Sequence, residues 1–186
     1  MAGQAGGLPK VVLAHGLENA LVGVAEPVGD AGIVDLELPG IALEPPRVLL
    51  IFLGDVVGRS GRDAVARELP LLRERYRPDL VVVNGENAAH GFGITEDIFL
   101  GLVAAGADVV TLGNHAFDQR EALIFIERHP TLIRPLNWPA GCPGRGAALV
   151  ETASGRRVLV MNAMGRVLIE PQLDDPFPAI SRELDT

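Results

Sequence analysis

The stretch "DLVVVNGEN" at residues 79–87 is an apolar run of strand length that ends in two amides and a carboxylate. A short apolar run bounded by polar residues is typical of a strand that is buried on both faces of a parallel sheet. The same scheme occurs in "RVLLIFLGD" at 47–55 and in "ADVVTLGNH" at 107–115. We therefore predict three buried parallel strands, each with polar residues at its carboxyl end.

The segments between these strands have the spacing of helices. In "GRDAVARELPLLRERY" (61–76), apolar residues recur at helical intervals between arginines and acids, and Pro70 is an irregularity that can kink the helix. After the Gly-rich stretch 90–93, Thr95 is the expected N-cap of a second helix, which should end near Gly106. Crossovers of this length predict a β-α-β-α-β run with right-handed connections.

The chain after the third strand changes character. "DQREALIFIERH" (118–129) predicts another helix that Pro130 stops, and "RPLNWPAGCPGRG" (134–146) predicts a turn-rich loop. "AALVETASGRRVLVMNA" (147–163) predicts a hairpin around Ser154–Gly155, which adds antiparallel strands after the parallel ones. No further strand is expected before the end of the sequence.

Composition divides the chain into two parts. Residues 1–46 hold one base against six acids and end in "LEPP", so we expect an N-terminal extension there, either small and β-rich or poorly ordered. Residues 47–186 should form a single α/β unit, since a chain of 186 residues with 48% hydrophobic content has room for about one sizeable core.

Charge and cysteine content exclude several classes of protein. The formal net charge is -8 and the bases are scattered, so binding to duplex nucleic acid or to a membrane surface is not expected. No apolar run is long enough for a transmembrane helix, and the N-terminus fits a secretory signal poorly. A single cysteine, Cys142, fits a reducing cytosol, so we expect a cytoplasmic protein.

Polar side chains follow all three predicted strands. These are Asp55 after the first, Glu86 and Asn87 after the second, and Asn114 and His115 after the third. The carboxyl ends of neighbouring parallel strands meet at one edge of a sheet, so these groups should share a small volume. Two carboxylates so close together repel each other unless a cation lies between them. Oxygen and nitrogen donors suit a pair of divalent metals, which points to hydrolysis of phosphoesters.

Each polar cluster also has a plain structural explanation. Gly-Asp after a strand is a common turn in which the Asp caps the next helix, and an Asn-His pair is usually a satisfied hydrogen-bonded pair. The joint occurrence at three strand ends favours a site. Of the other histidines, His90 is interpreted as a loop residue and His129 as a partner of a helix C-terminus.

The motifs "GDVVGRSGRDAV", "VVVNGENAAHGFGIT", "DVVTLGNHAFD" and "RPLNWPAGCPGRG" together resemble the N-terminal half of the YmdB-type family. These are calcineurin-like metallophosphoesterases associated with hydrolysis of 2′,3′-cyclic nucleotides, and the likeness covers about residues 47–180. It implies an α/β/β/α sandwich, incomplete at its C-terminus in this chain. The Asp-x-His motif of the wider superfamily is replaced by Asp55-Val56-Val57, as in the YmdB-type branch.

The resemblance also implies roles for the residues at the strand ends. Asp55, Glu86, Asn87 and Asn114 would be metal ligands, with Glu86 bridging two divalent ions of iron or manganese. His115 would protonate the leaving alkoxide or stabilise charge on the phosphoryl oxygens, which agrees with the proximity of an imidazole to a metal pair. The implied substrate is a cyclic nucleotide or another phosphodiester, in a cytoplasmic bacterial protein that often forms a homo-oligomer.

Three metal-binding histidines of the family's C-terminal half have no counterpart in this sequence. We therefore expect a truncated member whose own activity is weak or absent, because four oxygen ligands are too few to hold two transition metals tightly. The alternative is a non-catalytic nucleotide- or phosphate-binding module, or a scaffold that retains a half-site. Neither G-x-G-x-x-G nor a P-loop motif is present, which argues against dinucleotides and NTPs as ligands.

Overall fold

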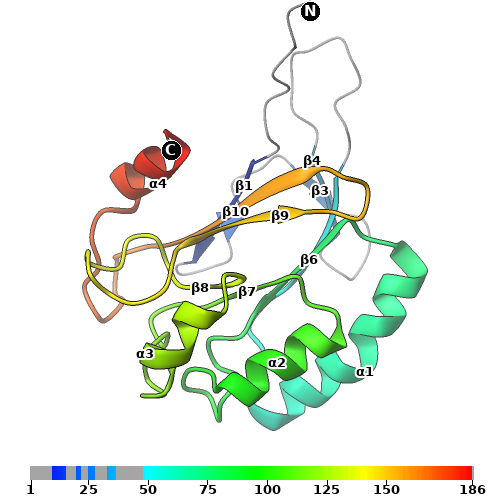
Figure 1. Ribbon diagram of the computed structural model, residues 1–186, viewed down its shortest axis with the longest axis horizontal. Coiled ribbons are helices and arrows are strands. Elements are labelled where there is room, and N and C mark those ends of the chain that lie inside the picture. The colour runs from blue at the N-terminus through cyan, green and yellow to red at the C-terminus, as the bar shows by residue number, and fades with distance from the viewer. Residues whose placement is uncertain (1–9, 16–19, 22–24, 28–32, 37–47, 186) are drawn as a thin grey trace, which may run out of the picture.

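Two β-sheets packed face to face organise the fold, with helices covering the outer face of the larger sheet (Figure 1). The computed structural model describes residues 10–15, 20–21, 25–27, 33–36 and 48–185, and side chains only from residue 48 onward. Across these residues the larger sheet has six strands, which are, in spatial order, β3 (Ala25–Pro27), β4 (Ile33–Leu36), β5 (Leu49–Leu53), β6 (Leu80–Asn84), β7 (Val109–Thr111) and β8 (Leu132–Ile133).

The three predicted parallel strands form the centre of the larger sheet. β5, β6 and β7 are adjacent and parallel, and β8 adds a fourth parallel strand beside β7. The register places Leu53 opposite Val83, and Asn84 opposite Thr111. All five residues of β6 are buried, as expected for a strand with layers on both faces. The predicted α/β class with a parallel sheet is confirmed.

The smaller sheet is built on the predicted hairpin. β9 (Ala147–Glu151) and β10 (Arg157–Met164) pair antiparallel, with Val160 opposite Ala148. The rest of this sheet comes from the N-terminal segment, as β1 (Lys10–His15) lies parallel to β10 and β2 (Ala20–Leu21) lies antiparallel to β1. The hairpin therefore forms a second layer rather than extending the parallel sheet.

The backbone of the N-terminal segment pairs with strands of both sheets. β4 pairs with β5 in the larger sheet, and β1 pairs with β10 in the smaller one. The remaining residues up to position 47 lie outside the described residues. The proposed division of the chain at residue 46 stays a prediction.

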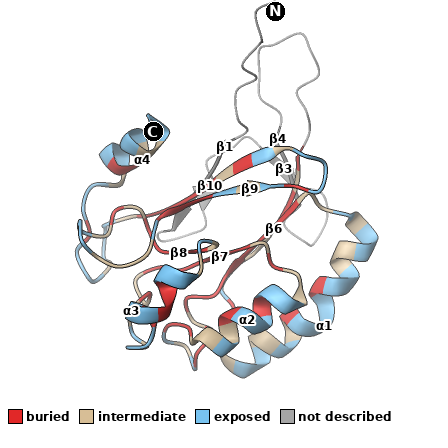
Figure 2. Ribbon diagram, in the orientation of Figure 1, coloured by how far each residue is buried: buried red, intermediate tan, exposed pale blue. Residues whose placement is uncertain are grey.

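Helices α1 (Gly58–Tyr76) and α2 (Glu96–Ala105) cover the larger sheet on the face opposite the hairpin. α2 begins and ends as predicted: the Thr95 hydroxyl accepts a hydrogen bond from the Ile98 amide, and Gly106 closes the helix in a left-handed conformation. Pro70 lies inside α1, whose buried residues Val65 and Leu69 face the sheet. Figure 2 shows exposed residues along the outer sides of both helices.

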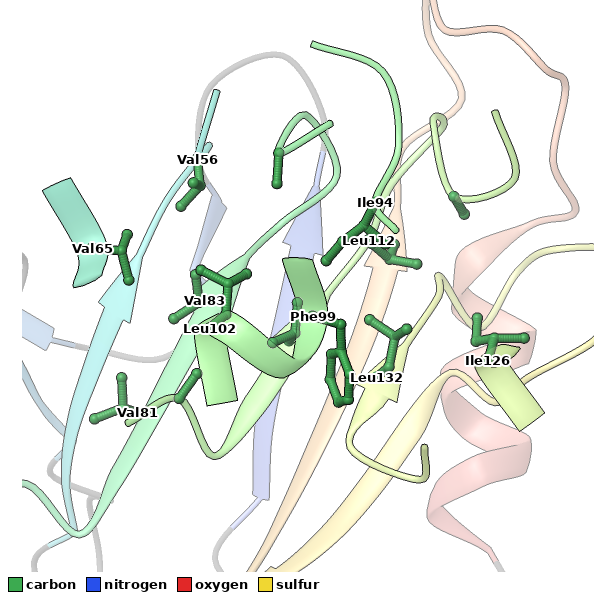
Figure 3. Packing of buried hydrophobic residues seen from close by; sticks show 14 of the residues in the cluster. Val56, Val65, Val81, Val83, Ile94, Phe99, Leu102, Leu112, Ile126 and Leu132 are labelled. Atoms are coloured by element: carbon green, nitrogen blue, oxygen red, sulfur yellow. The ribbon is translucent and has the colours of Figure 1, made fainter. Parts of the chain in front are cut away.

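The core has two parts because β6 alternates its side chains between two layers. Val81 and Val83 pack toward the helices, in a cluster that includes Phe99 and Leu102 of α2 (Figure 3). On the other face, Leu80 and Val82 belong to a cluster that contains Val158 and Val160 of the hairpin, among other residues. Each such fully buried side chain contributes about 1.5–3 kcal/mol to folding. The two clusters fix the sheet and hence its polar edge.

One predicted helix differs from the structure, and two elements of the structure were not predicted. The helix predicted at 118–129 is only one α-helical turn, α3 (Ala122–Phe125), followed by the 3-10 helix η1 (Ile126–Arg128), because the residues before Ala122 are held in turns. The short strand β8 was not predicted. Nor was α4 (Pro176–Leu184), whose N-cap Asp175 accepts a hydrogen bond from the Phe177 amide. Among the described residues, no helix has the length and apolar character needed to cross a bilayer.

Candidate active site

The carboxyl ends of β5, β6 and β7 are joined by backbone hydrogen bonds. The Val56 amide donates to the Asn84 carbonyl at 3.0 Å, and the Gly85 amide donates to the Thr111 carbonyl at 2.9 Å. The chain therefore leaves all three strands at the same edge of the sheet. The polar residues predicted at the three strand ends are brought to this edge.

Asp55 and Asn87 are in direct contact. The Asn87 side-chain amide donates to Oδ1 of Asp55 at 2.6 Å, although the two residues are 32 positions apart. Asp55 is exposed and has a φ of 38°, a left-handed conformation that costs a non-glycine residue of order 1 kcal/mol or more. Because Nδ2 of Asn87 makes this bond, its amide oxygen and Oδ2 of Asp55 are the atoms that can face a ligand.

Glu86 lies buried between the ends of β6 and β7. Only 2% of its surface is exposed, and its backbone amide donates to Oδ1 of Asn84 at 3.1 Å. Its carboxylate lies directly against Gly113, where the methyl carbon of an alanine would sit 1.8 Å from Oε2. Gly113 therefore provides the space for this carboxylate. The third strand end is thus in contact with the second, and Asn114 follows immediately.

His115 is held between two polar neighbours. Its Nδ1 lies 2.6 Å from Oδ2 of Asp118, and its Nε2 lies 3.2 Å from Nδ2 of Asn114. An ionised carboxylate only accepts hydrogen bonds, so Nδ1 carries a hydrogen and Nε2 accepts from the Asn114 amide. This arrangement turns the oxygen of Asn114 away from the imidazole, and leaves that oxygen as a donor atom for a cation.

Sequence reasoning missed three residues around these groups. Asn84, the last residue of β6, bonds the Glu86 amide; Asp118 orients His115; and the Phe92 ring meets the His115 ring edge-on at 5.3 Å between centroids. Asp118 had a signal in the sequence, since a carboxylate three positions after a histidine can meet it in a turn. Phe92 had none, because its position depends on the path of the loop.

The two other histidines whose side chains are described, His90 and His129, have different surroundings. His90 is an exposed loop residue with a φ of 58°. His129 was predicted to be the partner of a helix C-terminus, but its Nε2 lies 2.7 Å from Oε1 of Glu96. Hydrogen bonds from His129 and then from Arg128 lower the pKa of Glu96 below its ordinary value. The carboxylate of Glu96, rather than a helix end, is therefore the partner of His129.

The donor set at the strand ends suits part of a divalent metal site. Two carboxylates and two amides supply oxygen atoms, which hard and borderline divalent cations accept. The space left by the missing side chain of Gly113 holds one of these carboxylates at a buried position. Within the described residues, no three His, Cys, Asp or Glu side chains gather into a group that could hold a metal. The residues present could therefore supply part of the coordination shell of a metal ion.

A parallel sheet with helices on one face and a second sheet on the other is the fold of metallophosphoesterase-type phosphatases. The model of the family of YmdB-like proteins matches residues 51–186. The chain belongs to this family.

Named relatives agree with this assignment. The chain is 48% identical over 128 residues to a protein of Bacillus subtilis (strain 168) named 2′,3′-cyclic-nucleotide 2′-phosphodiesterase, a match that covers 69% of this chain and 48% of that protein. A solved structure of a hypothetical protein from Thermus thermophilus matches with a TM-score of 0.67 and 43% identity, over 73% of this chain and 52% of that one.

A second solved structure, described as a novel phosphatase from Mycoplasma pneumoniae, matches with a TM-score of 0.64 and 33% identity. That match covers 73% of this chain and 49% of the phosphatase. The chain therefore spans about half the length of the relatives that it matches.

Proposed function

We propose that this chain supplies the carboxylate and amide half of the active site of a metal-dependent phosphodiesterase. The observation that carries the proposal is the meeting of three strand ends, where Asn87 bonds Asp55 and the carboxylate of Glu86 lies on Gly113. The name of the Bacillus subtilis relative supports a 2′,3′-cyclic nucleotide, or a similar phosphodiester, as the substrate.

Four residues would hold the metal. They are Asp55, Glu86, Asn87 and Asn114, which would bind divalent ions of iron or manganese. Divalent metals in such a site polarise a phosphoryl oxygen and activate water at neutral pH. The left-handed backbone at Asp55 and the burial of Glu86 support this assignment, since strained and buried polar groups concentrate at functional sites.

His115 would carry the proton for the leaving group. Its Nδ1 hydrogen is fixed on Asp118, so Nε2 is the atom that exchanges a proton. Because Asp118 holds Nδ1, Nε2 is the ring atom that would pass a proton to the departing alkoxide oxygen. Asp118 therefore acts as the positioning residue for His115.

The remaining histidine ligands of the family would come from the half that the relatives have beyond the match. By itself this chain should bind metal weakly and turn over slowly. Its single cysteine, Cys142, fits a cytoplasmic setting, and a homo-oligomer is the expected assembly.

Manganese titration and a diesterase assay on the same protein test the proposal. The double variant Asp55→Asn/Glu86→Gln should lose Mn²⁺ binding, whereas Asp63→Asn, which removes an exposed carboxylate on α1, should keep it. Hydrolysis of a 2′,3′-cyclic nucleotide should be slow in this chain and should rise when it is fused to the C-terminal half of the Bacillus subtilis relative. Unchanged Mn²⁺ binding in the double variant would overturn the metal site.

The fusion also separates catalysis from simple binding. If the fused protein holds Mn²⁺ and the nucleotide but hydrolyses no diester, the chain is a non-catalytic binding module or scaffold. Replacement of His115 by alanine in the fusion should abolish hydrolysis and spare Mn²⁺ binding. Equal loss of both would contradict the role given to His115.

A further inference from the structure

Phe92 presents an aromatic ring to solvent beside the candidate active site. It is 58% exposed, whereas Phe99 and Phe125 are at most 2% exposed. Its ring lies edge-on to the His115 ring, with 5.3 Å between centroids and 86° between planes. Burial of Phe92 contributes little to folding at this exposure, and the feature that sets it apart is its contact with His115.

The loop around Phe92 is built to hold this ring in place. Gly91 and Gly93 on either side have φ values of 90° and 75°, which side chains rarely adopt. The Gly93 amide donates to the Glu86 carbonyl at 2.6 Å, and the Gln119 side chain donates to the Phe92 carbonyl at 2.7 Å. The loop is therefore tied to the second strand end and to the segment that carries His115.

The outer side of the loop is open. A methyl group added at Gly91 would meet no atom within 4 Å, whereas one at Gly93 would meet the His115 carbonyl at 3.1 Å. The loop thus packs on the active-site side and leaves space on the solvent side. With 58% of its surface exposed, Phe92 is accessible to a flat ligand.

We propose that Phe92 stacks on the nucleobase of a nucleoside phosphodiester, and so makes the site prefer nucleotides to diesters without a base. The inference rests on the proposed function, because it places the phosphate beside His115. In a nucleotide one sugar separates the phosphate from the base, and Phe92 is the aromatic neighbour of His115. Stacking uses the face of the ring and tolerates every base, so the preference extends to purines and pyrimidines alike.

Calorimetric titration at saturating Mn²⁺, with this chain fused to the C-terminal half of the Bacillus subtilis relative, tests the inference; the ligands are adenosine 3′-monophosphate and inorganic phosphate. Phe92→Ala should weaken binding of the nucleotide by roughly 5- to 150-fold and leave binding of phosphate unchanged. Phe92→Tyr should retain the nucleotide affinity, because the ring remains. Phe177→Ala is the matched control, since it removes a phenylalanine that is 77% exposed on α4, and should change neither affinity.

The outcomes separate this inference from the proposed function. If the wild-type protein binds phosphate but Phe92→Ala binds the nucleotide as well as the wild type does, stacking is wrong and the phosphoesterase proposal stands. Equal weakening of both ligands would also overturn stacking, because the ring would then act through His115. If the wild-type protein binds neither ligand, the proposed function fails and the inference fails with it.

Discussion

Replacement of Gly113 by alanine tests whether the contact between the second and third strand ends builds the cation site. The new methyl carbon would lie 1.8 Å from Oε2 of Glu86 and 2.6 Å from its Cδ, distances that no real contact adopts. The carboxylate must retreat to at least 3.0 Å, into surroundings in which Glu86 is only 2% exposed. The change should therefore displace the Glu86 carboxylate from its position against residue 113 and weaken cation binding.

The expected cost in stability follows from overpacking. Insertion of a group into a packed region costs about 1–3 kcal/mol, and the lower entropy of the unfolded alanine chain offsets about 0.4–1 kcal/mol of it. We expect Gly113→Ala to lower the free energy of unfolding by up to about 2.6 kcal/mol. If Glu86 swings into solvent instead, the loss of stability shrinks but the loss of Mn²⁺ affinity remains.

Gly101→Ala is the matched control for this change. Gly101 is exposed in α2 and a methyl group there would meet no atom within 4 Å, so alanine should stabilise the helix by up to about 1 kcal/mol. Urea unfolding followed by circular dichroism gives the free energies, and calorimetric titration gives the Mn²⁺ affinity. Wild-type stability together with wild-type Mn²⁺ affinity in Gly113→Ala would refute the role given to this contact.

Three other perturbations test the positioning residues and the supporting structure. Asp118→Asn should slow diesterase turnover by up to about 100-fold and leave the Mn²⁺ affinity unchanged, because only the orientation of His115 is lost. Steady-state kinetics on the fused protein measure this effect, and an unchanged turnover rate would contradict the role of Asp118. The pKa of Glu96 is lowered in the folded state, mainly by the hydrogen bond from His129. The ionised Glu96 carboxylate therefore stabilises the fold above about pH 4.5, and this stabilisation is lost as the pH falls through the lower folded-state pKa. Urea midpoints of the wild type and of Glu96→Gln should therefore differ at neutral pH and converge in acid, and a constant difference would count against the assignment. Arg134→Met should lower the free energy of unfolding in urea by at least about 2 kcal/mol, because the buried guanidinium donates to four backbone carbonyls. A smaller decrease in the free energy of unfolding would mean that water replaces these hydrogen bonds.

The central strands could be predicted because their sequence signals are local. β6 reads as a continuous apolar run since layers cover both of its faces, and Thr95 and Gly106 mark the limits of α2 through their own side-chain and backbone chemistry. The strand β8 could not be predicted from two residues, Leu132–Ile133, whose extended backbone depends on pairing with β7. In α4, Pro176 reads as a chain breaker although it occupies the first helical position, where proline is tolerated.

The sequence predicted which strand ends carry the residues of the candidate site. Topology alone brings Asp55 and Asn87 to one edge, so a parallel sheet was enough to anticipate their proximity. The partners of His115 depend on the paths of two segments, the turn after β7 and the loop before α2. In that loop His90, Gly91 and Gly93 have positive φ values, and the sequence alone does not give the resulting path. Phe92 therefore emerges only from the structure, whereas the spacing of His115 and Asp118 was a local signal in the sequence.

The strand-end cluster combines features that oppose folding, and this distinguishes it from the polar cluster around Glu96. Asp55 holds a left-handed backbone, and the carboxylate of Glu86 is buried in a space that requires glycine at 113. Glu96 is instead bonded by His129 and Arg128 at the surface, where its charge adds to stability. A network kept for folding should resemble the second cluster, whereas one kept for a ligand should resemble the first. Addition of Mn²⁺ should therefore raise the unfolding midpoint of the wild type and of Glu96→Gln alike, and should leave that of Asp55→Asn/Glu86→Gln unchanged.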